Sequence, residues 1–209
     1  MHTNHTASIV YRVRQCIAFA VFMMLAIIPL HLQAGDDAVP FELQVKLILS
    51  ALTYDRNLPT NPDHILTIGI LYFPDTEDSK PQAADFDKAL VMFTDKRVQN
   101  LRIDKIMLAY SDDADLTKAI HEHTIKVLYI APGRGEKLRN VLEVTRSQKV
   151  LSCTSNIMNF QEYEVSLGVG LLDNKPKIYL NNRSAKAEGA DFSAKFLRVV
   201  QLYDPGYVE

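Results

Sequence analysis

The chain has 209 residues, of which 47% are hydrophobic and 23% are charged, and its net charge is −2. This composition is that of a folded globular protein and excludes a disordered or low-complexity chain. The near balance of acidic and basic residues provides no basic surface for nucleic acid or anionic lipid, so we expect neither as a partner.

The N-terminal segment has the order of regions of a secretory signal. Two arginines precede an uncharged run of 15 residues that ends at Leu30, and small residues follow at Ala34 and Gly35. The run is shorter than the roughly 20 residues with which a helix crosses a bilayer. We predict a signal peptide over residues 1–34, export to the periplasm and a mature domain over 35–209. An uncleaved N-terminal anchor is the alternative, because Leu32 stands where cleavage favours a small residue.

Helices and strands alternate from Pro40 onward. Apolar residues recur at helical spacing after Pro40, and residues 65–73 form an almost wholly apolar run, typical of a strand buried on both faces. The pattern predicts helices over 40–56, 81–94, 116–123 and 133–147, and strands over 65–73, 103–110, 127–131 and 149–152. Such alternation is typical of βαβ units around a parallel sheet.

The last third of the chain has a different pattern. A turn-rich stretch at 173–176 separates two strand-like runs at 165–172 and 177–180, which predicts a β-hairpin. A helix is predicted over 183–202, with an interruption at Gly189. The predicted fold class is therefore α/β: a three-layer α/β/α sandwich with a mostly parallel sheet and a C-terminal β-hairpin plus helix.

Histidines and aspartates are the first candidates for a metal site. His121 and His123 stand two positions apart and point to different faces of a helix, whereas a zincin site needs a spacing of four. His64 has no partner nearby in the sequence. The three aspartates at 112–115 lack the ligand spacing and central glycine of a calcium loop, and acidic residues favour a helix start without any ligand. We predict helix capping and no metal.

Two polar segments follow predicted strands. Residues 132–137, Pro-Gly-Arg-Gly-Glu-Lys, lie between a strand and a helix but lack the glycine spacing of a phosphate loop, which favours a tight turn. Residues 181–183, Asn-Asn-Arg, are candidates for ligand contacts at the carboxyl edge of the sheet or for a helix cap. The sequence contains no nucleophile elbow and no convincing Ser–His or Cys–His pair. We expect no enzymatic activity and no cofactor.

Cys153 is the single cysteine that remains if residues 1–34 are removed. One thiol cannot close a disulfide within the chain, and Cys153 follows apolar residues in a predicted strand. A buried, inert thiol is the first interpretation. A reactive thiol, with a redox role or an intermolecular disulfide, is the alternative.

Several segments, in order, resemble the YfiR family of bacterial periplasmic proteins. The opening helix after Phe41 and the strands around 68–71 and 127–130 match the first half of the family pattern. Residues 177–181, followed by Gly189 and the Ser-Ala-Lys-Phe-Leu of 193–197, resemble its closing strand and helix.

This chain departs from the family at three points. Leu58 stands where a Trp is usual before Pro59, and no Gly-Gly precedes the hairpin strand at 165–170. The cysteine pairing of some members is reduced to Cys153. The resemblance therefore implies the fold more than any redox switching.

The resemblance implies a non-enzymatic regulator. Family members repress an inner-membrane diguanylate cyclase by docking on its periplasmic sensor, and relatives occur with histidine kinases. The implied partner is a membrane-bound diguanylate cyclase or histidine kinase, with cyclic di-GMP and biofilm formation as the output; a homodimer remains open. The alternative is a small periplasmic ligand-binding or sensory domain that works with a histidine kinase or transporter.

Overall fold

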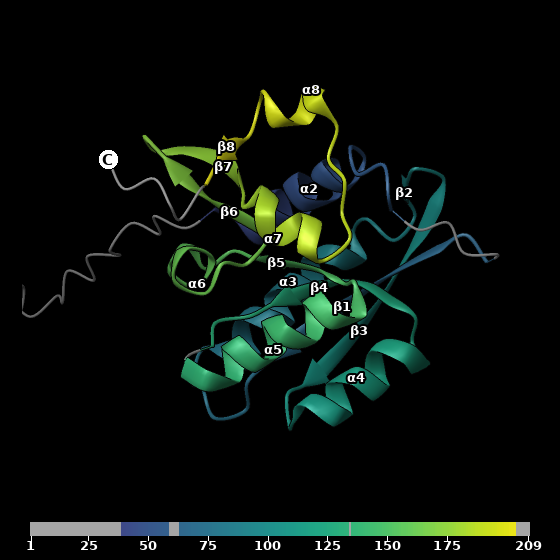
Figure 1. Ribbon diagram of the computed structural model, residues 1–209, viewed down its shortest axis with the longest axis vertical. Helices are drawn as coiled ribbons and strands as arrows, with labels where there is room; N and C mark the ends of the chain where they lie inside the picture. The colour runs from purple at the N-terminus through teal and green to yellow at the C-terminus, as the bar shows by residue number, and fades with distance from the viewer. Residues whose placement is uncertain (1–38, 59–62, 134, 204–209) are drawn as a thin grey trace, which may run out of the picture. The chain divides into compact units, whose positions relative to one another are not determined.

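A computed structural model describes residues 39–58, 63–133 and 135–203 (Figure 1). The predicted signal peptide lies outside these residues. One eight-stranded sheet, in the order β2-β3-β1-β4-β5-β6-β7-β8, runs through the described part. Its strands are β1 (Ile65–Tyr72), β2 (Arg97–Val98), β3 (Leu101–Ala109), β4 (Ile125–Ile130), β5 (Leu151–Thr154), β6 (Leu167–Leu172), β7 (Lys175–Leu180) and β8 (Gln201–Leu202).

The five central strands, β3-β1-β4-β5-β6, are parallel. β2 is antiparallel to β3, β7 is antiparallel to β6, and β8 runs parallel to β7. The predicted mostly parallel sheet is therefore confirmed, as is the hairpin, in which Val169 of β6 lies opposite Ile178 of β7. The chain places β3 on one side of β1 and β4 on the other, so the strand order reverses between β1 and β4. Open α/β sheets bind ligands at such a switch point.

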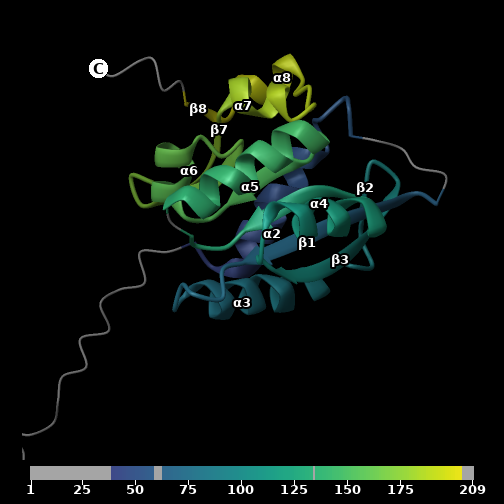
Figure 2. The same ribbon diagram turned by 60° about the horizontal axis from the view of Figure 1, so that its bottom comes forward.

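Helices cover both faces of the sheet (Figure 2). One face carries α2 (Phe41–Leu52) and α3 (Ser79–Val91), and the other carries α4 (Asp113–Glu122), α5 (Gly135–Gln148) and α6 (Ile157–Tyr163). The short helices α7 (Asn182–Ala187) and α8 (Ala194–Leu197) follow the hairpin. This is the predicted three-layer α/β/α arrangement. No helix of the described residues is long and apolar enough to cross a membrane.

β1 shows why the sheet needs two helical layers. Every residue from Leu66 to Leu71 is buried. Leu66, Ile68 and Ile70 contribute to the core beneath α2 and α3, whereas Leu71 contributes to the core beneath α4 and α5. Since successive side chains of a strand point to opposite faces, a wholly apolar strand is stable only when both faces are covered.

The helix starts follow the predicted caps. Asp112 accepts a hydrogen bond from the backbone N–H of Asp115 at 2.8 Å and caps α4. Asn181 accepts one from the N–H of Ser184 at 3.0 Å and caps α7. These contacts satisfy amides that the first turn of a helix leaves free.

The C-terminal helix predicted over 183–202, with its interruption at Gly189, is present only as the two short helices α7 and α8; the residues between them and after α8 are not helical. Gly189 adopts a φ of 88°, and the following residues run beside the segment after α2 instead of continuing α7. Arg56 N–H donates to the carbonyl of Asp191 at 2.9 Å, and Ser193 N–H donates to that of Tyr54 at 3.0 Å. The chain then forms α8 and the edge strand β8. Two further elements, β2 and α6, have no counterpart in the prediction.

Candidate functional site

The carboxyl edge of the parallel strands is the first candidate site. The loops after β1, β3, β4 and β5 lie at this edge, and each leads into a helix: α3, α4, α5 and α6. The edge therefore gathers four helix N-termini, whose dipoles favour polar and negatively charged groups.

Two aromatic rings pack against each other at the carboxyl ends of β1 and β3. Phe73 is 2% exposed, and a Cβ atom built on Gly133 would lie 2.3 Å from its ring. Tyr110 is tilted on the Phe73 ring, with the centroids 5.4 Å apart. Only a glycine fits at 133, because any larger residue would displace Phe73.

The aspartates at the start of α4 are held by local hydrogen bonds. Tyr110 donates its hydroxyl to Asp113 at 2.6 Å, and Ser111 donates to Asp115 at 2.7 Å. Burial is the main cause that raises the pKa of Tyr110 to about 12, and the hydrogen bond to Asp113 adds to it. The capping interpretation is confirmed. Within the described ranges, no group of three or more His, Cys, Asp and Glu residues could hold a metal ion.

The turn before α5 is tied to α6. Gly135 N–H donates to the hydroxyl of Tyr163 at 2.9 Å, and the side-chain amide of Asn159, oriented to satisfy both its groups, forms two 3.0 Å hydrogen bonds with the backbone of Gly133. Gly135 has a φ of 65°, a conformation that favours glycine. Gly133 and Gly135 are thus held by hydrogen bonds as a tight strand-to-helix turn predicts, and residue 134 between them lies outside the described residues.

Lys137 and Arg139 provide positive charge beside this turn. Lys137 Nζ lies 2.6 Å from the carboxylate of Asp75, and this hydrogen bond holds the pKa of Asp75 below its ordinary value. The guanidinium of Arg139 lies 5.6 Å from the centre of the Tyr163 ring. The edge thus presents exposed charges of both signs on a rigid frame.

Residues 181–183 do not reach this edge. β7 is antiparallel to the central strands, so its end at Leu180 lies at the amino edge of the sheet. There Asn181 N–H donates to the carbonyl of Ser166, just before β6. Of the two interpretations of this segment, the helix cap is confirmed and the ligand contact at the carboxyl edge is wrong.

A polar groove of about 300 Å³ lies near the amino ends of β1 and β4. His123 lines it, whereas His121 is exposed on α4 and His64 precedes β1. The groove is lined by Asp63, Ile65, Thr67, Asp104, Lys105, Ile106, Glu122, His123 and Thr124. We favour the carboxyl edge over this groove as the site of a small ligand, because the switch point lies at the carboxyl edge. The groove is open and polar, whereas small-molecule sites are mostly enclosed and apolar. No pattern in the sequence predicts the groove, since only the sheet topology brings its three segments together.

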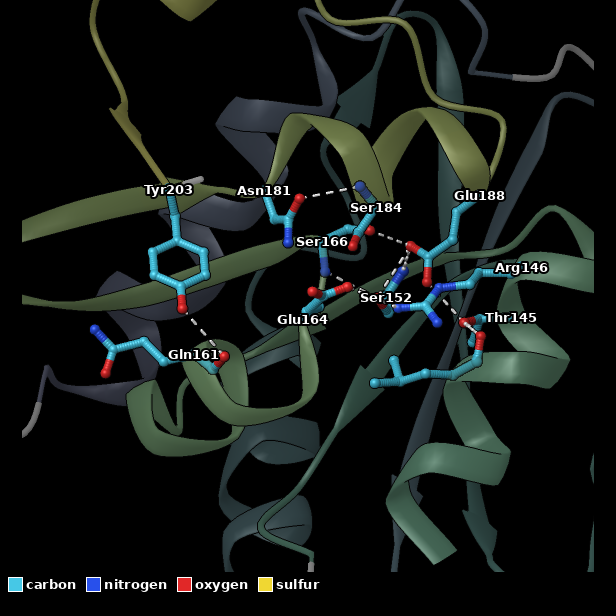
Figure 3. A network of polar contacts seen from close by, with 11 residues as sticks. Thr145, Arg146, Ser152, Gln161, Glu164, Ser166, Asn181, Ser184, Glu188 and Tyr203 are labelled. Carbon is cyan, nitrogen blue, oxygen red and sulfur yellow. Dashed lines mark hydrogen bonds and ion pairs between the residues drawn. The ribbon is translucent and has the colours of Figure 1, made fainter. Parts of the chain in front are cut away.

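A buried carboxylate, Glu188, also has no signature in the sequence (Figure 3). It is 2% exposed and lies at the end of α7, pointing toward α5 and the strands β5 and β6. Its oxygens accept hydrogen bonds from Thr145 Oγ1 at 2.7 Å, Ser152 N at 2.7 Å, Ser152 Oγ at 3.0 Å and Ser166 Oγ. Burial raises its pKa, and these hydrogen bonds oppose that effect. Because its acceptors are filled by internal donors, Glu188 is a structural group.

Cys153 lies fully buried in β5, as predicted. Burial, followed by the nearby charge of Glu188, raises the pKa of its thiol. A thiol that stays protonated is a poor nucleophile. The burial is confirmed, and the absence of a redox role remains a prediction.

No protein-family model and no curated protein matches the chain. Solved structures share its fold. A conserved domain protein from Vibrio cholerae O1 biovar El Tor aligns at 13% identity with a TM-score of 0.53, over 78% of this chain and 60% of that one. An ABC domain from Streptococcus pneumonia, solved in complex with L-Trp, aligns at 16% identity with a TM-score of 0.52, over 78% and 62%.

A third structure is the ligand-free, open form of a substrate-binding protein with adhesive properties from Clostridium difficile. It aligns at 13% identity with a TM-score of 0.47, over 66% of this chain and 54% of that one. The chain therefore spans about 60% of the length of the first two structures. At these identities the likeness shows the α/β fold and nothing finer.

Proposed function

We propose that this chain is an exported, non-enzymatic binding domain that holds a small polar ligand at the carboxyl edge of its sheet. In this proposal it works with a membrane partner, a histidine kinase or a transporter. The observation that carries the proposal is the reversal of strand order between β1 and β4, which is where open α/β sheets bind ligands. The fold shared with a domain that was solved in complex with L-Trp supports it.

The charges at this edge suit a ligand with both an amine and a carboxylate. Arg139 and the amides at the start of α5 attract a carboxylate, and the exposed Lys137–Asp75 ion pair provides one charge of each sign that a zwitterionic ligand can bind by replacing the pair. A free amino acid has both groups within a few ångströms of each other. The L-Trp complex of one structural neighbour makes amino acids the first class to test.

Thermal unfolding of the purified protein with a panel of amino acids tests the proposal. A ligand at a hundred times its Kd stabilises a protein by about 2.7 kcal/mol, which for a domain of this size raises Tm by about 5–10 °C. Lys137→Ala should abolish the shift. Lys118→Ala, which removes an exposed lysine paired with Glu122 on α4, is the matched control and should leave it unchanged. A panel that never shifts Tm would contradict the proposal.

A non-enzymatic role makes a separate prediction. The tyrosine and aspartate side chains at the start of α4 are engaged in local hydrogen bonds, which supports binding over chemistry. A ligand incubated with the protein should be recovered unchanged, as mass spectrometry can establish. Conversion of the ligand by protein purified to homogeneity would contradict this part of the proposal.

A second candidate is repression of a membrane diguanylate cyclase by docking, as the YfiR resemblance implies. The observation that favours it is the exposed outer edge of β3, where Met107 is 41% exposed. Deletion of the gene should then raise cyclic di-GMP, and a copy without residues 1–34 should not restore repression. An unchanged cyclic di-GMP level in the deletion strain would exclude this role.

A further inference from the structure

The outer edge of β3 is open over most of its length (Figure 1). β1 pairs with β3 along one side, from Arg102 to Ala109. On the other side, the two-residue strand β2 pairs only with Leu101 and Arg102. From Ile103 to Ala109, no strand of the described residues lies against this side.

The hydrogen-bonding groups of this edge can be assigned from the register. The N–H groups of Arg102 and Tyr110 donate to β1 residues or their neighbours, at 2.7 and 2.9 Å, so the even-numbered residues of β3 turn toward β1. The odd-numbered residues from Ile103 to Ala109 therefore turn outward. The Lys105 N–H is taken by the Asp104 carboxylate at 2.9 Å, whereas the outward groups of Met107 and Ala109 lie beyond the β2 pairing and have no backbone partner among the described residues.

The side chains near this edge differ between the two faces of the sheet. Lys105 and Met107 share the face that carries α3, and the Lys105 ammonium is paired there with Asp87 of that helix. Beyond this pair the face is apolar, with Met107 41% exposed and Ala109 exposed. An exposed strand edge with apolar side chains is a template for another strand.

The opposite face of the same edge borders the polar groove. Asp63, Asp104 and Glu122 bring three carboxylates into its lining, and among the described residues that line it His123 and Lys105 are the other ionisable groups. Lys105 is neutralised by Asp87, and Glu122 is 3.8 Å from the exposed Lys118. The groove therefore favours a positively charged occupant.

We propose that the β3 edge binds an extended segment of a partner protein in which Lys or Arg alternates with apolar residues. Such a segment adds a strand to the sheet through the outward groups of Met107 and Ala109. Since alternate side chains of a strand point to opposite faces, its basic residues reach the groove beside Asp104 while its apolar residues lie beside Met107. Main-chain hydrogen bonds provide affinity, and the carboxylates select the segment.

A second copy of this chain fits the edge less well. When the β3 strands of two copies pair antiparallel in one continuous sheet, the groove-facing residues of one copy lie opposite the groove-facing residues of the other. The even-numbered residues of the free part, Asp104, Ile106 and Leu108, include no cation. Arg102 is basic but lies where β2 covers the edge. The proposal concerns the lateral edge of β3, whereas the proposed solute site lies at the carboxyl ends of the strands, so the peptide and amino-acid experiments test the two separately.

Synthetic peptides with blocked ends test the proposal on the purified protein. We use a seven-residue peptide of alternating Val and Lys, its Val–Glu counterpart, and a Val–Lys peptide that is N-methylated on alternate residues. Fluorescence anisotropy should show saturable binding of the Val–Lys peptide. The Glu counterpart should bind at least ten-fold more weakly because its charge is opposite to that of the Lys peptide. The N-methylated peptide should also bind at least ten-fold more weakly, because it lacks main-chain donors.

Variants of the protein locate the binding. Asp104→Asn should weaken binding of the Val–Lys peptide several-fold, whereas the control Asp95→Asn, at an exposed aspartate near the end of α3, should not. Met107→Pro removes one outward N–H and should weaken binding with the circular dichroism spectrum unchanged. If Met107→Pro does not fold, Met107→Lys serves instead, since a like charge on the edge repels the peptide.

Three outcomes would overturn the proposal: equal binding of the Lys and Glu peptides, no binding of either, or binding that Asp104→Asn leaves unchanged. Sedimentation gives a fourth. A dimer at micromolar concentration that Met107→Lys converts to monomer would assign the edge to a second copy of the chain.

Discussion

Glu188 accepts a hydrogen bond from the backbone N–H of Ser152 at 2.7 Å, so a buried carboxylate joins the end of α7 to β5. Thr145 of α5 and Ser166 before β6 donate to the same carboxylate. Three separate parts of the chain thus share one acceptor. Burial and hydrogen bonds, and no nearby cation among the described residues, determine the pKa of this carboxylate. Removal of such an acceptor leaves several buried donors unsatisfied.

Glu188→Ala should lower the free energy of unfolding by about 3 kcal/mol, because the Ser152 amide and the hydroxyls that donate to Glu188 lose their acceptor in a buried site. Urea unfolding of both proteins measures the difference. Glu143→Ala, at an exposed position of α5, is the control and should change stability by less than about 0.5 kcal/mol. A loss equal to that of the control would show that the network contributes little.

The pH dependence of stability should report the same carboxylate. Burial raises the pKa of Glu188 in the folded protein above its ordinary value of 4.5, so the folded state binds this proton more tightly than the unfolded state. The stability contributed by this proton is fully present at pH values below the pKa of the unfolded state. It is lost as pH rises through the higher pKa of the folded state. Urea unfolding should show wild type losing stability relative to Glu188→Gln as pH increases from 4 to 8. Parallel pH profiles would contradict the prediction.

Gly133→Ala should destabilise the fold by about 2 kcal/mol, because the added methyl overlaps the Phe73 ring. In the Phe73→Leu background the same change should cost less than in the wild type, since the smaller side chain makes room. Thermal unfolding of the two single variants and the double variant measures this coupling. Additive losses would mean that the overlap is relieved elsewhere.

Cys153→Ala should leave ligand binding unchanged, because the thiol is buried and its raised pKa keeps it protonated. Iodoacetamide should label Cys153 slowly in the native protein and rapidly in urea, as mass spectrometry can follow. Cys153→Ser should cost about 1–3 kcal/mol if the buried hydroxyl finds no partner. A reductant response that disappears in the Ala variant would instead indicate an intermolecular disulfide.

Patterns within short stretches of sequence predicted much of the fold. The apolar run of β1, the turn of the β6–β7 hairpin and the cap at Asp112 are local signals, and the structure has all three. The segment after Gly189 was mispredicted because its conformation depends on hydrogen bonds to Tyr54 and Arg56, far away in the sequence.

The candidate sites divide in the same way. Residues 132–137 follow a strand directly, so the sequence could place them at the carboxyl edge. The groove beside β3 combines Asp63, Asp104 and Glu122, which share no spacing that a single sequence reveals. The acceptor role of Glu188 likewise depends on donors from three distant elements.

The hydrogen bonds between Asp55 and the segment near Phe192 have a consequence for synthesis. Asp191 N–H donates to Asp55 across 136 residues of chain, and the Tyr54 ring stacks on Phe196 at 5.2 Å. A nascent chain therefore makes Asp55 long before its partner Asp191. A chain that stalls before Asp191 lacks these partners, so the end of α2 stays open to proteases until synthesis has passed residue 196.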